Sequence, residues 1–268
     1  MSVIITAIIL LATLATAFLS SIFGMLGGLI LMGLLVSILP IASAMVLHGL
    51  IQLTSNGYRA WLNRTDIVWP IVTTLFIGNI VALAVLVWVA FTPDRITVLL
   101  ALGLLPYIAW ALPRNMALDV SKKPIGLLAG AVVVATNLLA GVGGPILDVF
   151  FQRVRLTRHQ VVATKAVAQA LGHISKIVFY GGLVASANRQ DWPSPYLLCA
   201  AIIASIIGTT LGKRVLDTMR DATFFTWTQR ILLSVGAVLI GRAIYLLAAL
   251  PAPIDAVHIA YAVRAQTN

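Results

Sequence analysis

Charged residues are scarce in this chain, and glutamate is absent. Only 10% of the 268 residues are charged, 60% are hydrophobic, and the mean hydropathy is +1.03. A soluble domain carries roughly a quarter of its residues as charged side chains. The composition therefore excludes a soluble globular protein and predicts an integral membrane protein.

Residues for covalent or metal chemistry are equally scarce. Cys199 is the single cysteine, which excludes an internal disulfide and a metal site built from several cysteines. The sequence contains neither an HExxH motif nor a Walker A motif. Ser20, Ser21 and Ser55 have no histidine and aspartate partners at the spacing of a catalytic triad. We therefore expect neither an enzyme nor a bound metal or cofactor.

Charge is also missing from the whole stretch between Met1 and Arg59. This stretch is far longer than the roughly 20 residues that cross a bilayer once, so the chain must fold back within it. A secretory signal fits poorly, because a positively charged start is missing and many apolar segments follow. Charges and helix breakers delimit the later segments, which predict transmembrane helices at 41–58, 67–91, 96–112, 159–183, 194–212 and 223–248.

Two further apolar segments, 3–39 and 125–151, are interrupted by glycines. The interruptions are Gly24, Gly27 and Gly28 in the first segment and Gly141-Val142-Gly143-Gly144-Pro145 in the second. Backbone groups cannot stay unsatisfied against lipid, so each break must face protein or water. We expect each segment to be a re-entrant helix hairpin whose second helix presents free amides to an anion. Two alternatives stay open: the glycines serve only close helix packing, or residues 3–22 form a full span.

The two halves of the chain resemble each other at an offset of 117 residues. The offset superposes the glycine breaks, and it pairs His48 with Lys165, Gln52 with Gln169, Asn56 with His173 and Arg59 with Lys176. Several matches in the same order indicate an internal repeat. We expect a first transmembrane repeat at 1–113, a cytoplasmic linker at 114–124, a second repeat at 125–250 and a polar tail at 251–268.

Lys and Arg predict how these repeats lie in the membrane. If each half is one hairpin plus three transmembrane helices, the halves insert with opposite orientation, as in the inverted repeats of secondary transporters. With the linker in the cytoplasm, most basic residues fall on the cytoplasmic side, as the positive-inside rule requires. These residues are Arg59, Arg64, Arg114, Lys122, Lys123, Arg153, Arg155, Arg158, Lys213, Arg214 and Arg220, against Arg95, Arg189, Arg242 and Arg264 on the other side.

A polar stripe follows each glycine break. Both stripes have spacings of four, four and three residues, so each lies on one helical face. Polar groups at membrane depth are costly, which makes a function the default hypothesis. The residues proposed to bind substrate are Gly27, Gly28, His48, Gln52, Asn56, Gly143, Gly144, Lys165, Gln169 and His173. Arg59 and Lys176 lie near predicted helix ends, and we expect them to reach the membrane interface.

The sign of the charges indicates the substrate class. Apart from Asp148, the ionisable residues within the segments are Lys and His, and the predicted helix N-termini are also positive. A cation site would need carboxylates, so the substrate is expected to be an anion. Asp148 is a candidate for ion coupling, or a simple ion-pair partner of Lys165, Arg153 or Arg155.

The doubled arrangement resembles the TauE/SafE sulfite exporter family, also called the toluene sulfonate uptake permeases. In the first half the resemblance rests on 23–29, Leu39-Pro40 with Ala42 and Ala44, and Asn56. In the second half it rests on 140–145, the Leu156-Thr157-Arg158 turn, Thr164, and the stretch from Gly181-Gly182 to Asp191-Trp192. Leu26 and Pro145 stand where the motifs have glycine, and Thr157 stands where the first half has Pro40.

The resemblance implies a secondary carrier for sulfite, sulfonates or related small anions in the cell inner membrane. Only "sulfur-containing" depends on the family, because the residues themselves indicate a small anion. An anion channel and a non-transport sensor or assembly module stay open as alternatives. Coupling to H⁺ or Na⁺, the direction of transport, and whether the protein works as a homodimer also stay open. Beyond the substrate and the lipid bilayer we expect no partner, and in particular no nucleic acid.

Overall fold

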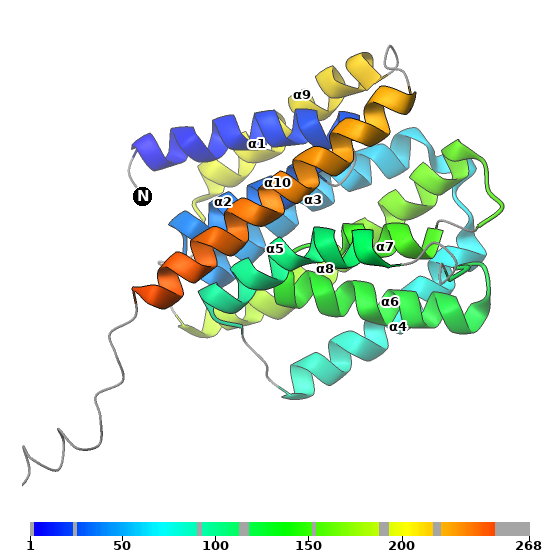
Figure 1. The fold of residues 1–268 in the computed structure, drawn as a ribbon, viewed down its shortest axis with the longest axis horizontal. Helices are drawn as coiled ribbons and strands as arrows, with labels where there is room; N and C mark the ends of the chain where they lie inside the picture. The colour runs from blue at the N-terminus through cyan, green and yellow to red at the C-terminus, as the bar shows by residue number, and fades with distance from the viewer. Residues whose placement is uncertain are drawn as a thin grey trace, which may run out of the picture.

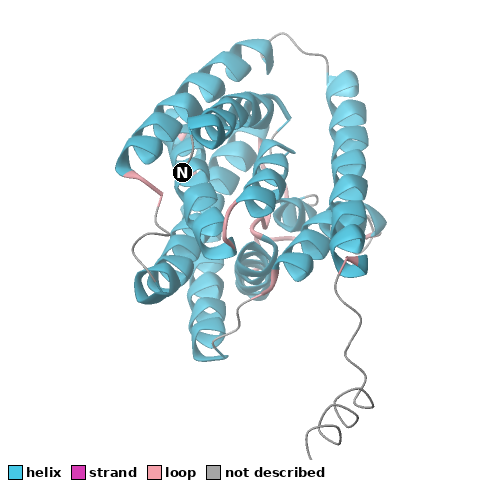
Figure 2. Ribbon diagram, turned by 90° about the vertical axis from the view of Figure 1, so that its left-hand side faces the viewer, coloured by secondary structure: helices cyan, strands magenta, loops and turns pink. Residues whose placement is uncertain are grey.

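The computed structural model describes residues 3–23, 26–89, 93–112, 118–151, 154–187, 193–216 and 221–249. Within these ranges every regular element is a helix, which confirms the all-α prediction (Figures 1 and 2). The predicted tail, 251–268, lies outside the described residues. The helices are α1 (Val3–Phe23), α2 (Leu26–Ile38), α3 (Ile41–Leu62), the short 3₁₀ turn η1 (Arg64–Asp66), α4 (Trp69–Val89), α5 (Arg95–Ala111), α6 (Lys123–Ala140), α7 (Gly144–Phe151), α8 (Arg158–Ala187), α9 (Pro195–Leu216) and α10 (Asp221–Ala248).

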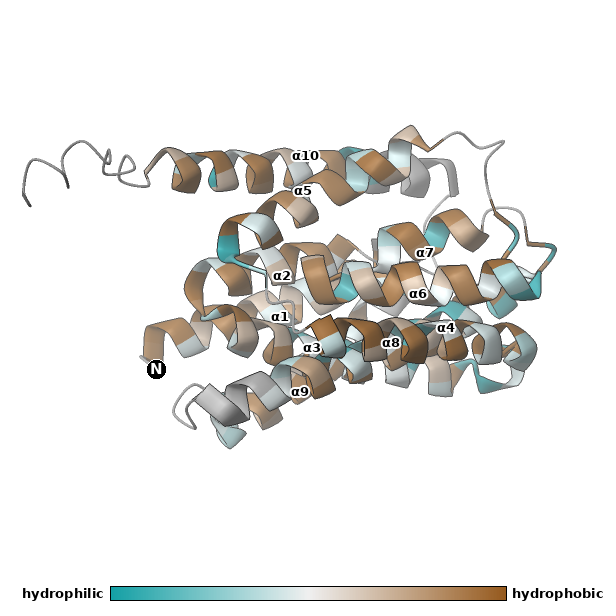
Figure 3. Cartoon of the chain, turned by 90° about the horizontal axis from the view of Figure 1, so that it is seen from below, coloured by the Kyte–Doolittle hydropathy of each residue, from teal (hydrophilic) through white to brown (hydrophobic). Residues whose placement is uncertain are grey.

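The length and apolar character of the helices fit a multi-pass membrane protein. In the described part of the chain, five helices are long and apolar enough to cross a bilayer: α1, α4, α6, α9 and α10. Figure 3 shows that hydrophobic residues cover much of the outside of these helices. The helices α3 and α8 are as long but carry the polar stripes, and they lie inside the bundle where those stripes face protein.

Both glycine segments are broken helices, as the sequence predicts. In the second segment α6 ends at Gly141, whose φ of 80° is the left-handed conformation that glycine adopts without strain. Helix α7 then begins at Gly144 with Pro145 in its first turn. In the first segment α1 has 21 residues, the length of the alternative full span, and α2 has 13. Gly24 lies outside the described residues, whereas Gly27 and Gly28 are in the first turn of α2.

Helices of the two halves pack in matched pairs. Helix α1 packs along α9, α4 packs along α6, α3 packs on α8, and α5 packs on α10. Gly78 of α4 lies against the backbone of α6 at Leu127, and Gly208 of α9 lies against the backbone of α1 at Leu14. Exchanging the halves turns one pair of helices into the other, although the backbone position that each glycine meets differs by about one helical turn. Such pairing is what an inverted repeat would produce, although the repeat and its domain boundaries stay predictions.

Hydrogen bonds next to these glycines follow the same pattern. The Ser175 hydroxyl of α8 donates to Oδ1 of Asn79 on α4 at 2.6 Å. In the other half, the Ser55 hydroxyl of α3 lies 3.1 Å from the Thr209 hydroxyl of α9. The two stripe helices, α3 and α8, are therefore each tied to the neighbouring helix contributed by the opposite half.

The connections gather at two ends of the bundle. At the linker end, the Val120 amide donates to the Phe150 carbonyl at 3.2 Å, and the Val68 amide donates to the Thr164 hydroxyl at 3.0 Å. At the opposite end, Arg95 donates to the Leu39 carbonyl at 3.2 Å. There Asp94 caps α5, and hydrogen bonds from Thr97 hold the pKa of that carboxyl below its usual value. The Val120–Phe150 contact thus brings the start of α6 and the end of α7 to the same end, as a re-entrant hairpin requires.

Candidate functional site

A small cavity lies where the two polar stripes face each other. Its lining comes from α1, α2 and α3 on one side and from α6, the start of α7 and α8 on the other. The volume open to the centre of a water-sized sphere is about 30 Å³. One water needs about 10–15 Å³ by this measure, so the cavity suits a small polyatomic ion rather than a large organic molecule. The predicted site residues that line it are Gly28, His48, Gln52, Asn56, Gly143, Gly144, Gln169 and His173.

The helical spacing of the stripes explains how these side chains meet. Successive turns of α3 bring His48, Gln52 and Asn56 onto its cavity side, and α8 does the same for Gln169 and His173. The His48 and His173 rings meet edge to face, with their centroids 5.7 Å apart. Gln52 and Gln169 come from equivalent positions of the two halves, as do Asn56 and His173. The cavity therefore offers similar groups from both sides.

Glycines at the breaks have distinct roles. A methyl group at Gly28 would lie 3.4 Å from the side-chain amide of Gln52, which is an ordinary contact inside the cavity. A methyl group at Gly27 would overlap the Thr16 carbonyl oxygen of α1. At Gly143 it would lie 2.5 Å from the Val133 carbonyl oxygen, although this residue also lines the cavity. Gly27 therefore packs closely on α1, Gly28 leaves room in the cavity, and substrate binding by either glycine stays a prediction.

Lys176 is buried at the centre of the bundle, so the prediction that it reaches the membrane interface is wrong. Its side chain is fully buried, and Nζ lies 2.6 Å from His48 Nδ1 and donates to the Gly141 carbonyl at 2.8 Å. Helix α8 continues for eleven residues beyond Lys176, to Ala187, which places this lysine well inside the helix. On the other side of the ring, His48 Nε2 lies 2.9 Å from the Gly28 carbonyl.

Arg59 also departs from the expected position. It lines the cavity instead of pointing away from it, and its guanidinium donates to the Ser20 carbonyl at 3.4 Å and to Asn56 Oδ1 at 3.5 Å. Arg59 lies three residues before the end of α3, so it marks the part of the cavity nearest the linker end. An arginine there supplies positive charge to the cavity.

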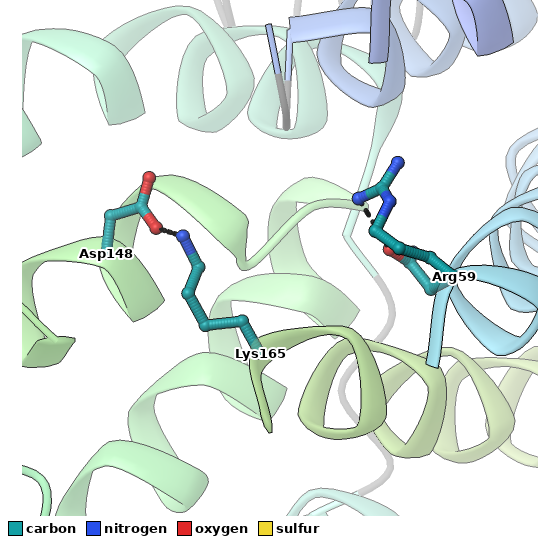
Figure 4. Close-up of polar contacts among 4 residues, drawn as sticks. Arg59, Asp148 and Lys165 are labelled. Atoms are coloured by element: carbon teal, nitrogen blue, oxygen red, sulfur yellow. Dashed lines mark hydrogen bonds and ion pairs between the residues drawn. The ribbon is translucent and has the colours of Figure 1, made fainter. Parts of the chain in front are cut away.

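Lys165 is held by an acidic partner outside the cavity lining. Figure 4 shows Lys165 of α8 pointing to Asp148 of α7, with which it forms an ion pair. The ion pair is the simpler of the two roles expected for Asp148. Arg59 lies on the other side of Lys165, near enough for the two positive charges to repel each other. The roles of Lys165 in substrate binding and of Asp148 in coupling stay predictions.

Two cavity residues were missed from the sequence. Ser20 of α1 and Asn137 of α6 line the cavity and are nearly fully buried. Ser20 Oγ, Asn137 Oδ1 and His173 Nδ1 find no hydrogen-bond partner in the described protein. The 117-residue offset places Ser20 on Asn137, so the repeat contained the signal that would have found them. Buried polar groups left unpaired are costly, which indicates that a polar occupant completes them.

The charge of the cavity favours an anion. Among the described residues that line it none is acidic, whereas Arg59 and the amide side chains of Gln52 and Gln169 offer hydrogen-bond donors. The described residues also hold no group of three or more His, Cys, Asp or Glu side chains that could bind a metal ion. Charge-assisted hydrogen bonds to arginine and neutral bonds from amides are the usual means of holding an oxyanion.

A comparison with known families agrees with this chemistry. The family model described as "Sulfite exporter TauE/SafE" matches residues 8–249. The chain belongs to the TauE/SafE family. Comparisons with curated proteins and with solved structures gave no significant match. Family membership makes the protein a multi-pass membrane transporter of the sulfite exporter type.

The motifs that carry the TauE/SafE resemblance surround the cavity. Gly28, Asn56, Gly143 and Gly144 belong to those motifs, and all four line it. The departure at Pro145 occupies the first turn of α7, where proline is compatible with a helix start. The family-typical sequence therefore builds the place where the helices break and the polar stripes meet.

Proposed function

We propose that this TauE/SafE protein is a secondary transporter that moves a small anion, such as sulfite or a sulfonate, across the cytoplasmic membrane. The single observation that carries the proposal is the cavity between the halves. It is lined by paired polar residues, contains Arg59 and has no acidic lining residue in the described structure. A compact oxyanion would accept bonds from Gln52, Gln169 and Arg59 together, and from the Ser20 hydroxyl, which lacks a partner in the described structure.

Alternating access is the mechanism that this arrangement favours. Helix α9 packs on both α1 and α3, helix α8 packs on both α4 and α6, and the cavity lies where α3 meets α8. A site between two such bundles can be exposed to either side when one bundle rocks against the other.

Sulfite counterflow in proteoliposomes tests the proposal. Vesicles loaded with unlabelled sulfite should transiently accumulate labelled sulfite from outside, because a carrier exchanges one substrate molecule for another. A channel would equilibrate the label without overshoot, and a sensor or assembly module would show no flux. Either of these outcomes contradicts the proposal.

A thermal-shift screen of purified protein identifies the preferred anion. Sulfite, sulfate, thiosulfate, taurine, isethionate, sulfoacetate and carboxylates form the panel. We expect the compact oxyanions to raise the melting temperature most, because the cavity is small.

A further inference from the structure

A continuous hydrogen-bonded chain joins the two helix breaks through the centre of the protein. It runs from the Gly28 carbonyl to Nε2 of His48, from Nδ1 of His48 to Nζ of Lys176, and from Lys176 to the Gly141 carbonyl. A carbonyl can only accept, so Nε2 carries a hydrogen and Nδ1 of the neutral ring accepts from the lysine. The chain crosses from the first half to the second at the 2.6 Å contact between Lys176 and His48.

The charged form of this pair has no acidic partner. Lys176 is fully buried, and an ammonium ion within a membrane protein is costly unless a counter-charge compensates it. The ionisable groups nearest to the pair are His173 and Tyr180 of α8, and Tyr180 donates to the Leu138 carbonyl. Arg59 lies farther along the cavity, and Asp148 is engaged by Lys165. The described residues of α2 and α4 include no ionisable side chain, and in α6 and α9 such residues lie only near the helix ends.

We propose that the Lys176–His48 pair is the proton-binding site that couples anion movement to proton movement. This inference deepens the proposed function, and it rests on that function. An anion in the cavity supplies the counter-charge that the protonated pair lacks. The proton and the anion therefore stabilise each other, and the linkage between them is reciprocal.

The geometry gives the proton a route. Lys176 does not line the cavity, whereas His48 does, so the ring connects the buried amine to the substrate space. The proton passes from Nζ to Nδ1 along their hydrogen bond, which leaves a neutral amine and an imidazolium. When the bond from Nε2 to the Gly28 carbonyl opens, Nε2 gives its proton to water or to the anion in the cavity. The ring is then neutral, and one proton has left Lys176.

Opening that bond loosens a connection within the first half, and loss of the proton loosens one between the halves. The contact to Gly28 holds α3 to the start of α2, and the contact to Gly141 holds α8 to the end of α6. Loss of the proton weakens the link between His48 and Lys176, the polar contact that crosses between α3 and α8 at this level. The same two residues therefore bind the proton and connect helices that would move when the bundles rock.

Sodium does not suit the site, because hard cations take oxygen ligands and carboxylates, whereas this pair presents nitrogen.

Sulfite flux under a pH gradient tests the proposal, with the membrane potential clamped at zero by potassium and valinomycin. A pH gradient of one unit should drive up to about tenfold accumulation of sulfite by the wild-type protein if one proton moves with each anion. A trapped pH dye should report proton movement that depends on sulfite. Lys176→Met should keep sulfite counterflow, because Lys176 does not line the cavity, and it should lose accumulation driven by the pH gradient.

Controls separate the possible failures. Lys176→Arg keeps the positive charge but does not release a proton, so it should also lose coupling. Because it preserves the charge and the hydrogen-bond donors, it distinguishes loss of coupling from a folding defect in Lys176→Met. Lys123→Met and His159→Gln, at the linker end, should behave like the wild type. Absence of wild-type counterflow would refute the proposed function itself. Wild-type counterflow without accumulation driven by the pH gradient, or coupling that survives in Lys176→Met, would overturn the proton site alone.

Discussion

Single side chains set the charge that the cavity accepts. Arg59 is the cationic residue that lines it, while Gln52, Gln169 and Asn56 supply neutral donors. Ser20, Asn137 and His173 each bring a buried polar atom without a protein partner in the described structure. A small oxyanion carries the opposite charge to Arg59 and accepts hydrogen bonds from the amides and the Ser20 hydroxyl, whereas Asn137 Oδ1 needs a donor such as water. The strength of each contact can therefore be tested one residue at a time.

Arg59→Met removes the positive charge from the cavity and keeps most of the side-chain volume. A charge-assisted hydrogen bond contributes roughly 1.5–3 kcal/mol, so the affinity for sulfite should fall about tenfold to a hundredfold. Isothermal titration in detergent measures the change. Arg64→Met is the matched control, because Arg64 lies beyond the end of α3 and contacts Trp61. Equal affinity in the Arg59 variant and the control would exclude Arg59 from the site.

Gly28→Ala should weaken anion binding, whereas Gly27→Ala should lower the stability of the protein, although the two residues are neighbours. The added methyl at Gly28 narrows the cavity beside Gln52, so anion binding should weaken while the protein stays folded. The methyl at Gly27 overlaps the backbone of α1, so the melting temperature in detergent should drop. Normal sulfite binding by a folded Gly28→Ala protein would show that Gly28 serves packing alone.

Helix pairs contributed by opposite halves hold the bundle around the site. The α4–α6 and α1–α9 pairs approach closely at glycines, where main chains touch without side chains between them. Small residues at helix crossings are the usual way to gain packing contacts when lipid removes the hydrophobic driving force. The stripe helices α3 and α8 are fixed between these pairs, which keeps their polar faces opposed.

Gly78→Ala tests this packing at the α4–α6 crossing. The new methyl would overlap the Leu127 carbonyl oxygen, so unfolding should become easier by about 1–3 kcal/mol. Gly57→Ala is the matched control in α3, because nothing lies within 4 Å of its added methyl. Thermal unfolding followed by tryptophan fluorescence compares the two. If Gly78→Ala were as stable as Gly57→Ala, close packing at this crossing would not support the fold.

Most helices and both breaks could be predicted from the sequence, because apolar length, glycines and charges act locally. Lys176 could not be placed correctly, since a lysine near a predicted helix end normally reaches water. Only the continuation of α8 to Ala187 and the position of His48 on α3 show that it is buried. Ser20 and Asn137 were missed because each is an ordinary small polar residue within an apolar helix. Their importance depends on tertiary contacts between α1, α6 and α8.

At the scale of the whole molecule, positive charge and helix direction should fix the orientation in the membrane. The linker and the turn before α8 lie at the same end of the bundle, which is expected to be cytoplasmic. Cysteines introduced by Ser121→Cys and Thr157→Cys in a Cys199→Ser background should resist impermeant thiol reagents in intact cells. They should react after the membrane is permeabilised. Labelling of either site from outside would contradict the orientation.

The central claim is that the anion binds between the halves, in the cavity where the stripes meet. Selenite resembles sulfite in shape and charge, and selenium scatters anomalously, so crystals soaked with selenite would locate the anion directly. The account predicts an anomalous peak within hydrogen-bond distance of Gln52, Gln169 and Arg59, and a weaker peak in Arg59→Met crystals. A peak beside the Asp148–Lys165 ion pair, with the cavity empty, would contradict it.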